Sequence, residues 1–451
     1  MPLVEADVCV VGAGFAGLAA ADKLRQAGCS VVVLEARDRV GGKVVTQTLA
    51  DGAAVNMGGT WIGAGHDRLH ALAREMGLET YRQYVQGDSL VIVDGTARRY
   101  SGIIPRVNPL ALVDVGLAVK MLDWMASDVP ADAPWDAPKA REWDSQTLGA
   151  WIDSRLHATT DIGQKMLRVF FTGLFMSDPA EVSLLHALHL IHCLNSIEWI
   201  GGAIGGAQQD LVVGGMQGIA IRLAARLGDA IRLETPVRRV IQFDGGVEAA
   251  GDAATARAGR MIITAPLTLA ARLDYDPPLP PLRMQLMDRA PQGQAIKWHA
   301  VYPEPFWRGD GLSGNGLDLD NAPEETLDCT PREGKPGVLA AFAFGPSARA
   351  LATTSPDERR RICVDGLVRR FGPKAANPAH FLELDWAAQE WSRGDMFAHY
   401  APGVLTGFGR ALREPCGRIH WAGTETAALW QGSIEGAIRS GERAADEALK
   451  G

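Results

Sequence analysis

A glycine-rich turn near the N-terminus limits the fold of this chain more than any other feature of its sequence. The turn Gly12-Ala-Gly14-Phe-Ala-Gly17 lies between an apolar, β-branched stretch, Asp7 to Val11, and an Ala/Leu-rich stretch, Phe15 to Ala27. A second buried-strand pattern, Val31 to Leu34, follows Gly28, a residue suited to ending a helix. Residues 7 to 35 therefore predict strand, turn, helix and strand, which is one βαβ unit of a parallel sheet.

The same turn has the geometry that a dinucleotide needs. In such a turn Gly12 permits the tight bend, Gly14 lets a pyrophosphate approach the backbone, and Gly17 lets helix and strand pack closely. The first amides of the helix then face the phosphates. Glu35 ends the second strand 18 residues after Gly17 and is placed to accept from ribose hydroxyls. We therefore expect a dinucleotide to bind here.

A second copy of the glycine pattern has to be weighed against the first. Glycine makes up 51 of the 451 residues, so the spacing is also expected by chance. Gly309-Asp-Gly311-Leu-Ser-Gly314 follows Pro305-Phe-Trp-Arg and runs into Asn315-Gly316, with no strand or helix pattern around it. We interpret this second match as a loop that imitates the motif.

The middle of the chain has a helical pattern. Five prolines between residues 101 and 145 separate short helical stretches. Leu148 to Leu156 and Ile162 to Phe175 continue the helical spacing of apolar residues. This region predicts a helical layer, and no internal repeat or low-complexity tract is present in the sequence.

Strand patterns return after the helical region, at residues 230–240, 261–265, 293–303 and 337–344. The segment DPPLPP at 276–281 predicts a domain boundary. The last two strands are expected in another sheet, separated by a loop rich in Gly, Pro and acidic residues. The apolar positions from Ile434 to Leu449 recur every three or four residues, which predicts a final amphipathic helix.

Charge and hydropathy exclude several classes of protein. Lys and Arg number 45 and Asp and Glu 53, a net charge of −8 at pH 7, so nucleic acid is a poor partner. The longest stretch free of these residues, Val182 to Ile197, is shorter than the roughly 20 residues of a membrane-spanning helix. The N-terminus lacks a signal peptide pattern, and the six cysteines are scattered without a CxxC pair. We expect a soluble, cytoplasmic protein with no membrane partner.

Further motifs extend the glycine turn into a resemblance that runs nearly end to end. An arginine-rich turn ending in paired glycines follows Glu35 and adds amides and cations near a pyrophosphate. The segments are Ala36 to Lys43, Met57-Gly-Gly-Thr-Trp-Ile-Gly63, Gln208 to Gly218, Gln294 to Lys297, Ala401 to Thr406, His420 to Ala427, Trp430 to Gly436 and Gly441 to Ala445. Together they resemble the flavin-containing amine oxidase family, and within it a soluble flavin monoamine oxidase of bacterial type.

The resemblance implies an α/β fold of two domains. One is a Rossmann-type FAD-binding domain with a parallel sheet, and the other is a substrate domain with a mixed sheet flanked by helices. We assign residues 1–80, 211–285 and 385–451 to the first domain. Residues 81–210 and 286–384 then form the substrate domain with its helical layer.

The resemblance also implies which residues contact FAD. The start of the last helix, near Gly432 to Glu435, would point at the flavin pyrimidine ring and stabilise its reduced anion. The expected FAD-binding residues are Gly12, Gly14, Phe15, Ala16, Gly17, Glu35, Ala36, Arg37, Gly42, Lys43, Gly58, Gly59, Thr60, Trp61, Val237, Trp386, Trp391, Gly423, Thr424, Glu425, Ser433 and Ile434.

Lys297 is the one expected catalytic residue. It lies in the apolar strand pattern Ala295-Ile-Lys-Trp298, where an unpaired ammonium would cost several kcal/mol. In the family the matching lysine holds a water against flavin N5 and assists reoxidation by oxygen. A structural ion pair is the alternative.

Several positions depart from the better-known animal enzymes of the family. Asp395 stands where those enzymes have a cysteine bonded to the flavin, so FAD is expected to bind non-covalently. Met396 and Ser433 occupy the two positions of an aromatic cage around the substrate amine, so the usual cage is absent. Lys43 replaces an arginine and loses its bidentate fork. The sequence ends after the last helix without a hydrophobic tail, which implies a soluble enzyme.

The substrate pocket is expected between the helical layer and the second sheet. Its predicted lining is Phe171, Leu174, Phe175, Met176, Gln208, Phe342, Phe344, Met396 and Trp430, with core packing as the alternative for each. The tryptophans at 386, 391, 421 and 430 either wall the flavin or fill the core. His186, His189 and His192 share one helix face, but without Cys or acidic partners we expect no metal site.

These features predict an FAD-dependent monoamine oxidase. A primary or secondary, mostly apolar amine would transfer a hydride to flavin N5, and the imine would hydrolyse to an aldehyde or ketone plus ammonia or a smaller amine. Oxygen would be reduced to hydrogen peroxide. Two alternatives remain: a flavin desaturase or oxidase of the protoporphyrinogen or carotenoid type, and a flavin-binding interaction module that has lost catalysis. The partners are the amine and O2, and a homodimer is left open.

Overall fold

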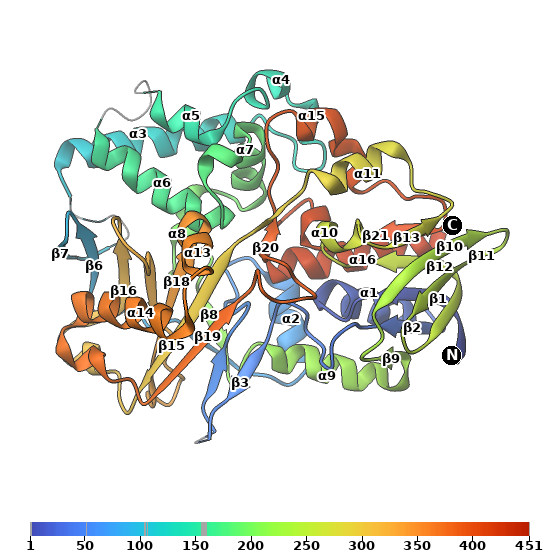
Figure 1. Cartoon of the computed structure of the whole chain (residues 1–451), viewed down its shortest axis with the longest axis horizontal. Coiled ribbons are helices and arrows are strands. Elements are labelled where there is room, and N and C mark those ends of the chain that lie inside the picture. Colours follow the sequence, from blue (N-terminus) through green and yellow to red (C-terminus); the bar gives the residue numbers. More distant parts are fainter. Residues whose placement is uncertain (1, 51, 103–104, 106, 155–159, 451) are drawn as a thin grey trace.

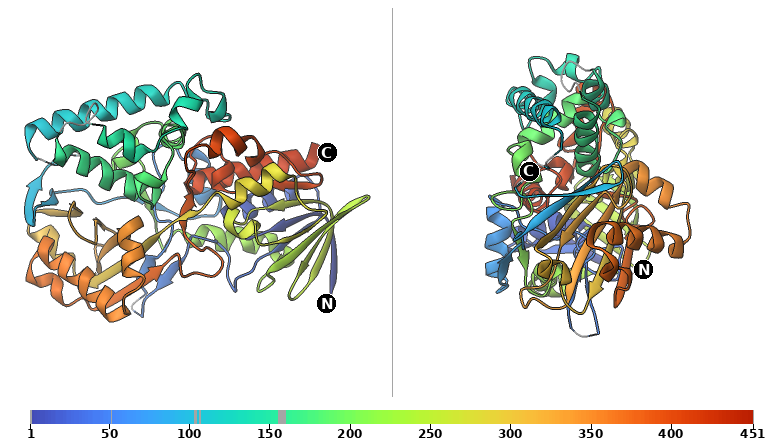
Figure 2. Two further views of the ribbon diagram at one scale, coloured as in Figure 1. Left: turned by 45° about the horizontal axis from the view of Figure 1, so that its top comes forward. Right: turned by 90° about the vertical axis from the view of Figure 1, so that its left-hand side faces the viewer.

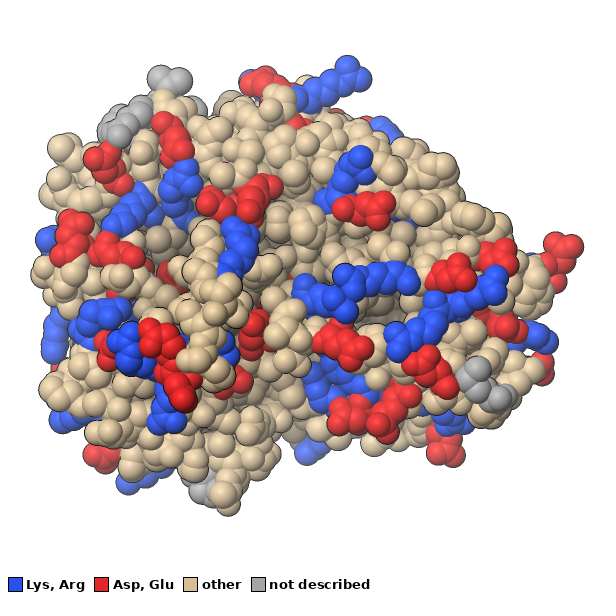
Figure 3. All heavy atoms as spheres, viewed as in Figure 1, with Lys and Arg blue, Asp and Glu red and all other residues tan. Residues whose placement is uncertain are grey.

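The structure, a computed structural model, describes residues 2–50, 52–102, 105, 107–154 and 160–450. Two sheets lie side by side, each at the centre of one lobe, and a layer of helices lies against the lobe of the second sheet (Figure 1, Figure 2). The N-terminus and the C-terminus both lie at the lobe of the first sheet (Figure 1). Positive and negative side chains are interspersed on the face seen in Figure 3, so no field of one sign dominates it.

The first sheet has eight strands and contains the N-terminal βαβ unit. In spatial order they are β13 (Asp274–Asp276), β10 (Val237–Phe243), β11 (Gly246–Gly251), β12 (Thr255–Ile263), β1 (Leu3–Val11), β2 (Val31–Leu34) and β9 (Ile231–Arg232), with β21 (Ile419–Trp421) beside β12. Strand β1 pairs in parallel with β2 and with β12, whereas β10 to β12 pair antiparallel. The predicted parallel βαβ unit is therefore confirmed.

Both faces of β1 are covered, because successive side chains point to opposite sides of a strand. Val8 and Val10 pack against one group of helices: α1 (Phe15–Gln26), α2 (Asp67–Glu75), α9 (Gln217–Leu227) and α16 (Ile434–Lys450). Cys9 and Val11 face the other side, which is closed by α10 (Leu267–Ala270), α11 (Pro281–Asp288) and α15 (Val404–Phe408). A strand buried on both faces reads as a continuous apolar run, as in this sequence.

The second sheet has seven strands, in the order β19 (His380–Asp385), β15 (Ala295–Tyr302), β18 (Gly337–Phe344), β17 (Glu325–Asp328), β16 (Leu312–Asp318), β6 (Asp88–Val93) and β7 (Thr96–Tyr100). Leu339 and Ala341 point to α13 (Gly345–Leu351) and α14 (Pro356–Phe371). Phe342 and Phe344 point to the opposite side, toward the first lobe. This alternation divides β18 into a core face and a face that is free to line a cavity.

The helical layer consists of α3 (Pro109–Ala126), α4 (Ala140–Trp143), α5 (Leu148–Asp153), α6 (Asp161–Phe175), α7 (Leu184–Cys193) and α8 (Ile197–Gly201). Three two-stranded sheets pair β3 (Thr46–Thr48) with β4 (Ala54–Asn56), β5 (Thr80–Arg82) with β8 (Asp210–Val212), and β14 (Gln292–Gly293) with β20 (Asp395–Ala398). The short helices are α12 (Phe306–Gly309) and the 3-10 turns η1 (Pro134–Asp136), η2 (Pro179–Glu181), η3 (Gly228–Ala230), η4 (Pro373–Ala376), η5 (Gly409–Leu412) and η6 (Thr424–Thr426).

Two expectations for the segment between the last two predicted strands were wrong. The second glycine match is not a free loop, because Gly309 ends α12 and Gly314 lies inside β16. Strands β16 and β17 also occupy the stretch that was expected to be a loop. Strand β16 pairs with β6, more than 200 residues earlier in the chain, and β17 lies between β16 and β18, so the local pattern did not reveal them. The last two residues of the predicted helix from Leu148 to Leu156 lie outside the described residues.

Close backbone contacts hold the helices of the first lobe together. A Cβ placed on Gly441 of α16 would lie 2.0 Å from the carbonyl oxygen of Ala16 in α1. Only glycine fits at that separation, so the two helices approach each other more closely than side chains allow.

We predict that Gly441→Ala lowers the free energy of unfolding by about 1–3 kcal/mol, because the added methyl group pushes α16 away from α1. Thermal and denaturant unfolding monitored by circular dichroism would measure the change. Gly116→Ala in α3 is the matched control, since its Cβ would meet no atom within 4 Å and alanine favours a helix. Equal stability of the Gly441 variant and the wild type would contradict the account.

Candidate active site

A large cavity of about 1080 Å³ lies between the two lobes, at the upper end of the sizes usual for ligand pockets. Its walls come from the ends of β1 and β2 on one side and from β15, β17 and β18 on the other. Helices α3, α6 and α8 close the side of the second lobe. The carboxyl ends of parallel strands open into this cavity, which is where open α/β sheets bind ligands.

The glycine turn forms one end of the cavity. Gly12 has φ +104°, and a Cβ there would lie 2.5 Å from Thr264 Oγ1. A Cβ on Gly17 would lie 1.9 Å from the carbonyl oxygen of Gly12. Position 17, in the first turn of α1, can therefore hold only glycine. Gly14 precedes α1 without a side-chain cap, which leaves the first amides of the helix free for an anion.

Glu35 holds this turn in shape. Its Oε2 accepts a hydrogen bond from Ala13 N at 2.6 Å, and its Oε1 accepts one from Arg37 N at 2.9 Å. A carboxylate oxygen accepts more than one hydrogen bond, so Glu35 can also serve a ribose hydroxyl. It lines the cavity, as the sequence predicted.

A second glycine turn lies against the first. Gly41 and Gly42 have φ values of +102° and +60°, and Gly41 N donates to the carbonyl oxygen of Ala13 at 2.8 Å. A Cβ on Gly42 would lie 3.1 Å from Gly14 Cα. Two backbones that meet without side chains leave a groove with exposed amides, which suits a pyrophosphate.

Lys43 joins the glycine turns to the short sheet of β14 and β20. Its Nζ donates to Gln292 Oε1 at 2.5 Å and to the carbonyl oxygen of Met396 at 3.1 Å. Burial lowers the pKa of Lys43, and the charges of Glu425 and Asp395 oppose this shift. Burial raises the pKa of Asp395, which the charge of Lys43 opposes. The lysine thus links β14 and β20 to the glycine turns from a buried position.

Lys297 uses all the protons of its ammonium group within the protein. Nζ donates to the carbonyl oxygen of Asn56 at 2.8 Å, to that of Gly58 at 2.9 Å and to Thr60 Oγ1 at 2.8 Å. Burial lowers its pKa to about 8. Among the described residues no carboxylate forms a salt bridge with it, so the alternative of a structural ion pair is wrong. Its role toward a water and oxygen stays a prediction.

Charged side chains line the cavity on both sides. Four arginines line it on the side of the first sheet, namely Arg37, Arg238, Arg272 and Arg393. Eight carboxyl groups also line it: Glu35, Glu390, Asp395 and Glu425 come from the segments around the first sheet, and Asp123, Glu198, Glu324 and Glu325 come from the second sheet and the helical layer, together with Lys120 and Lys297. Among the described lining residues, the arginines come from the first lobe alone, so a cationic group is better accommodated on the side of the second sheet and the helical layer.

Glu325 is an acidic side chain that the sequence analysis missed. It lies opposite Phe342, which in turn lies opposite Lys297, so the three form one row across β17, β18 and β15. Burial raises the pKa of Glu325 to about 7, although the charge of Arg370 lowers it. Within the described part of the chain, nothing forms a hydrogen bond or ion pair with its carboxyl group. The composition of this segment predicts a loop, and the alternation of side chains along a strand is no guide in a loop.

Most of the predicted site residues line the cavity. All of the predicted FAD-binding residues except Gly17 do so, and Gly17 makes the predicted close contact between helix and turn. Of the predicted substrate residues, six line the cavity: Leu174, Met176, Gln208, Phe342, Phe344 and Met396. Trp386 and Trp391 also line it, whereas Trp421 is buried in the core against the guanidinium of Arg283, 3.6 Å away.

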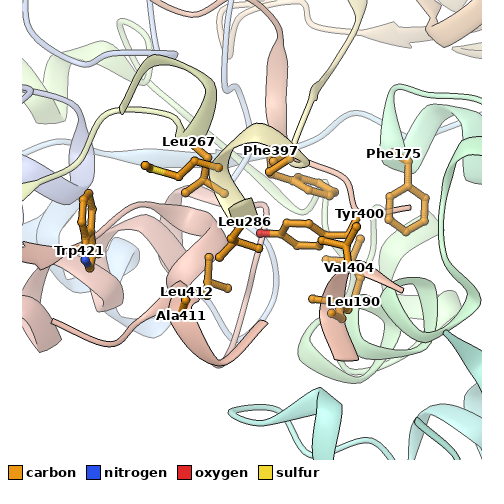
Figure 4. Packing of buried hydrophobic residues seen from close by; sticks show 14 of the residues in the cluster. Phe175, Leu190, Leu267, Leu286, Phe397, Tyr400, Val404, Ala411, Leu412 and Trp421 are labelled. Atoms are coloured by element: carbon orange, nitrogen blue, oxygen red, sulfur yellow. The ribbon is translucent and has the colours of Figure 1, made fainter. Parts of the chain in front are cut away.

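Phe171 and Phe175 do not line the cavity, which corrects the prediction. Both lie on the face of α6 that turns into the helical core, and Phe175 contacts Phe397 with 6.0 Å between ring centroids (Figure 4). Successive residues of a helix are about 100° apart, so Phe170 and Leu174 face the cavity instead. The spacing of apolar residues in α6 did not show which face of the helix lines the cavity and which packs in the helical core.

Trp430 lies one layer behind the cavity wall. Its ring is 4.7 Å from that of Trp199 and 5.0 Å from that of His66, and both of those residues line the cavity. Trp430 itself does not line the cavity, so the prediction that it contacts the substrate directly is wrong. It packs behind Trp199 and His66 instead.

The three spaced histidines do not form a metal site. His186 Nδ1 accepts from Tyr400 N at 3.1 Å, and His189 Nε2 lies 2.9 Å from the carbonyl oxygen of Ala131. In the residues that the structure describes, no group of three His, Cys, Asp or Glu side chains is arranged to hold a metal ion.

These features fit FAD. The two glycine turns would hold its pyrophosphate and Glu35 its ribose, while the cavity continues past Lys43 to Lys297. Trp386 Nε1 is buried without a partner in the protein, and a Cβ on Gly58 would lie 2.9 Å from the Trp386 ring. In the part of the chain described here no cysteine lines the cavity, so no thioether to the flavin can form there. FAD accordingly binds non-covalently.

The described helices were also compared with the requirements of a membrane span. None of them is both long enough and apolar enough to cross a bilayer.

Comparisons with known proteins agree with the geometry. Residues 15–449 match the family described as "Flavin containing amine oxidoreductase". A protein of Mycobacterium tuberculosis named as a flavin-containing monoamine oxidase (AofH) is 40% identical over 442 residues, covering 98% of this chain and 96% of that protein.

Two solved structures are similar over their whole length. A wild-type putrescine oxidase bound to putrescine has a TM-score of 0.96 and 35% identity, covering 100% of both chains. Cyclohexylamine oxidase from Brevibacterium oxydans has a TM-score of 0.95 and 35% identity, covering 99% of both chains. Together with the cavity, these similarities confirm the predicted two-part α/β fold, and the chain belongs to the flavin-containing amine oxidase family as an FAD-dependent amine oxidase.

Proposed function

We propose that this enzyme oxidises a primary or secondary amine with a largely apolar body to an aldehyde or ketone, with release of ammonia or a smaller amine. Bound FAD would accept a hydride equivalent from the amine α-carbon and pass the electrons to O2, giving hydrogen peroxide. The observation that supports this substrate class is the lining of the cavity on the side of the second sheet, which is mostly apolar and aromatic.

The aromatic part of that lining is rigid. The rings of Phe342 and Phe344 are stacked, with 5.6 Å between centroids and 16° between planes, and Trp61 lies 6.4 Å from Phe342. Met176 and Met396 complete an apolar surface that excludes water. Such a surface disfavours the charged form of an amine, and the ammonium of Lys297 disfavours it further. The substrate amine would therefore react in its neutral form, with Gln208 as a polar contact.

The residues proposed to bind the cofactor lie on the side of the first sheet. We propose that the turns at Gly12 to Gly17 and Gly41 to Gly42 hold the pyrophosphate. Gly432, Ser433 and Ile434 line the cavity at the start of α16, where helix amides favour negative charge on a bound group. The strands of the first sheet fall within 1–80, 211–285 and 385–451, which supports assigning these residues to the FAD-binding domain. Residues 81–210 and 286–384 would form the substrate-binding domain.

A second candidate substrate is an amine with a distal ammonium group, such as putrescine, which one of the similar structures binds. Glu325 favours it, because it faces the cavity two strand spacings, about 10 Å, from Lys297. A carboxyl group without a protein partner in an apolar wall gains most from a cationic ligand.

We further propose a cytoplasmic location, which the six unpaired cysteines support, and a homodimer. Cell fractionation and light scattering of the purified protein test these two points, and a membrane-bound or monomeric protein would contradict them.

Anaerobic mixing of the purified yellow protein with amines tests the proposed reaction. We expect cyclohexylamine and related alkyl or aryl amines to bleach the flavin absorbance, because the cavity orients an apolar amine and excludes water. Stopped-flow absorbance would measure the rate. If dithionite bleaches the flavin and no amine does, the proposed function is wrong.

Glu325→Gln tests the second candidate. We expect kcat/KM for putrescine to fall roughly ten- to a hundredfold, the range for losing a charged hydrogen bond, while cyclohexylamine changes by less than about twofold. Because a cation binds the ionised carboxylate, the ratio of the two kcat/KM values should rise with pH through about 7 in the wild type and stay flat in the variant. An equal fall in kcat/KM for both amines would show that Glu325 does not bind the distal ammonium group.

A further inference from the structure

The segment from Asn56 to Thr60 forms part of the cavity wall and is fixed from one side by close contacts. A Cβ on Gly58 would lie 2.0 Å from the carbonyl oxygen of Lys43, and a Cβ on Gly59 would lie 3.0 Å from Ile434 at the start of α16. Gly58, Gly59 and Thr60 all line the cavity. The position of this segment therefore sets the shape of the wall where Lys43 and α16 meet.

Lys297 holds the same segment from the other lobe. It comes from β15 of the second sheet, and its three protons go to the carbonyl oxygens of Asn56 and Gly58 and to Thr60 Oγ1, at 2.8–2.9 Å. Thr60 Oγ1 donates its own proton to the carbonyl oxygen of Gly58 at 2.8 Å, so it can only accept from Lys297. An ammonium group has three protons, and none remains for a water.

The other surroundings of the ammonium group are aromatic. The ring of Trp61 lies 5.4 Å from Nζ and that of Phe342 lies 5.2 Å from it, and the side chain is only 3% exposed. Asn56 is itself anchored, because its Oδ1 accepts from Met216 N at 3.0 Å and from Thr46 Oγ1 at 2.9 Å. The contacts thus run without a break from β15 through Lys297 and Asn56 to β3 and to Met216, the residue that precedes α9.

We propose that Lys297 is a positioning residue that fastens the 56–60 segment, and with it one wall of the FAD cavity, to the sheet that lines the substrate side. The inference rests on the proposed function, since it assigns the lysine a role in an amine-oxidising FAD site. This positioning role differs from a role in which Lys297 only holds a water during reoxidation of the flavin by O2. Loss of the ammonium group would remove a donor from the carbonyl oxygen of Asn56 and one of the two donors to that of Gly58, and the segment would shift.

The two roles predict different kinetics. If Lys297 fastens the segment, its removal weakens FAD binding and slows both reduction by the amine and reoxidation by O2, because both occur against the same wall. If it acts only through a water in the oxygen step, reoxidation alone slows.

Lys297→Met and Thr60→Val, made in the full-length holoenzyme, test the proposal. The measurements are the FAD dissociation constant after reconstitution, the anaerobic reduction rate with cyclohexylamine and the reoxidation rate with O2, the last two at saturating FAD. We expect Lys297→Met to raise the dissociation constant and to slow both half-reactions, each by about tenfold or more. Thr60→Val, which removes one of the three acceptors, should change all three quantities in the same direction by less.

A double variant and a control complete the test. Lys297→Met combined with Thr60→Val should lose less than the sum of the two single variants, because both remove the contact between Lys297 and Thr60. Leu339→Ala, which opens a cavity in the core face of the same sheet, should lower stability without changing the reduction rate of the FAD-loaded enzyme.

The proposal is overturned if Lys297→Met leaves the FAD dissociation constant and the reduction rate within twofold of the wild type and slows only reoxidation. That outcome leaves the proposed function intact. Failure of every amine to reduce the wild-type enzyme would instead overturn the proposed function itself.

Discussion

Close approach of backbones at glycine is the constraint on which the rest of the structure depends. A Cβ would lie 1.9 Å from a carbonyl oxygen at Gly17, 2.0 Å at Gly441 and 2.0 Å at Gly58. These three contacts bring α1 to the first turn, α16 to α1 and the 56–60 segment to Lys43. A side chain at any of the three positions would push these backbones apart. A cavity lined by backbone on one side can hold an anionic dinucleotide without a cluster of lysines.

The second sheet supplies the side chains of the substrate side of the cavity. Its cavity face alternates with its core face along every strand, so Lys297, Phe342 and Glu325 form one row that combines a cation, an aromatic ring and a carboxyl group. Lys43 and Lys297 are the two buried ammonium groups of the cavity, and each is satisfied by oxygens from segments distant in the chain. Burial is tolerated because these donors are paired. The two lobes are thereby joined at the place where cofactor and substrate would meet.

How far the sequence predicts this site depends on how local each feature is. The turn at Gly12 to Gly17 and the role of Glu35 depend on residues within one βαβ unit, and their placement was correct. Phe171 and Phe175 were placed wrongly because a turn of about 100° per residue decides which face of α6 is inward, and only its packing in the helical core settles that. Glu325 was missed because β17 gains its strand character from pairing with β18. The three acceptors of Lys297 lie more than 200 residues away, and no local pattern points to them.

The central claim is that the glycine-lined end of the cavity binds the ADP half of FAD reversibly while the rest holds the flavin. Titration of the apoprotein with FAD, FMN and ADP, followed by flavin fluorescence, tests it most directly. The account predicts that FAD binds one to one and restores the holoenzyme, that ADP competes with FAD, and that FMN binds at least tenfold more weakly, because it has no pyrophosphate or adenosine for the turns to hold. Equal affinity for FMN and FAD, or a flavin that remains attached after the protein is denatured, would contradict it.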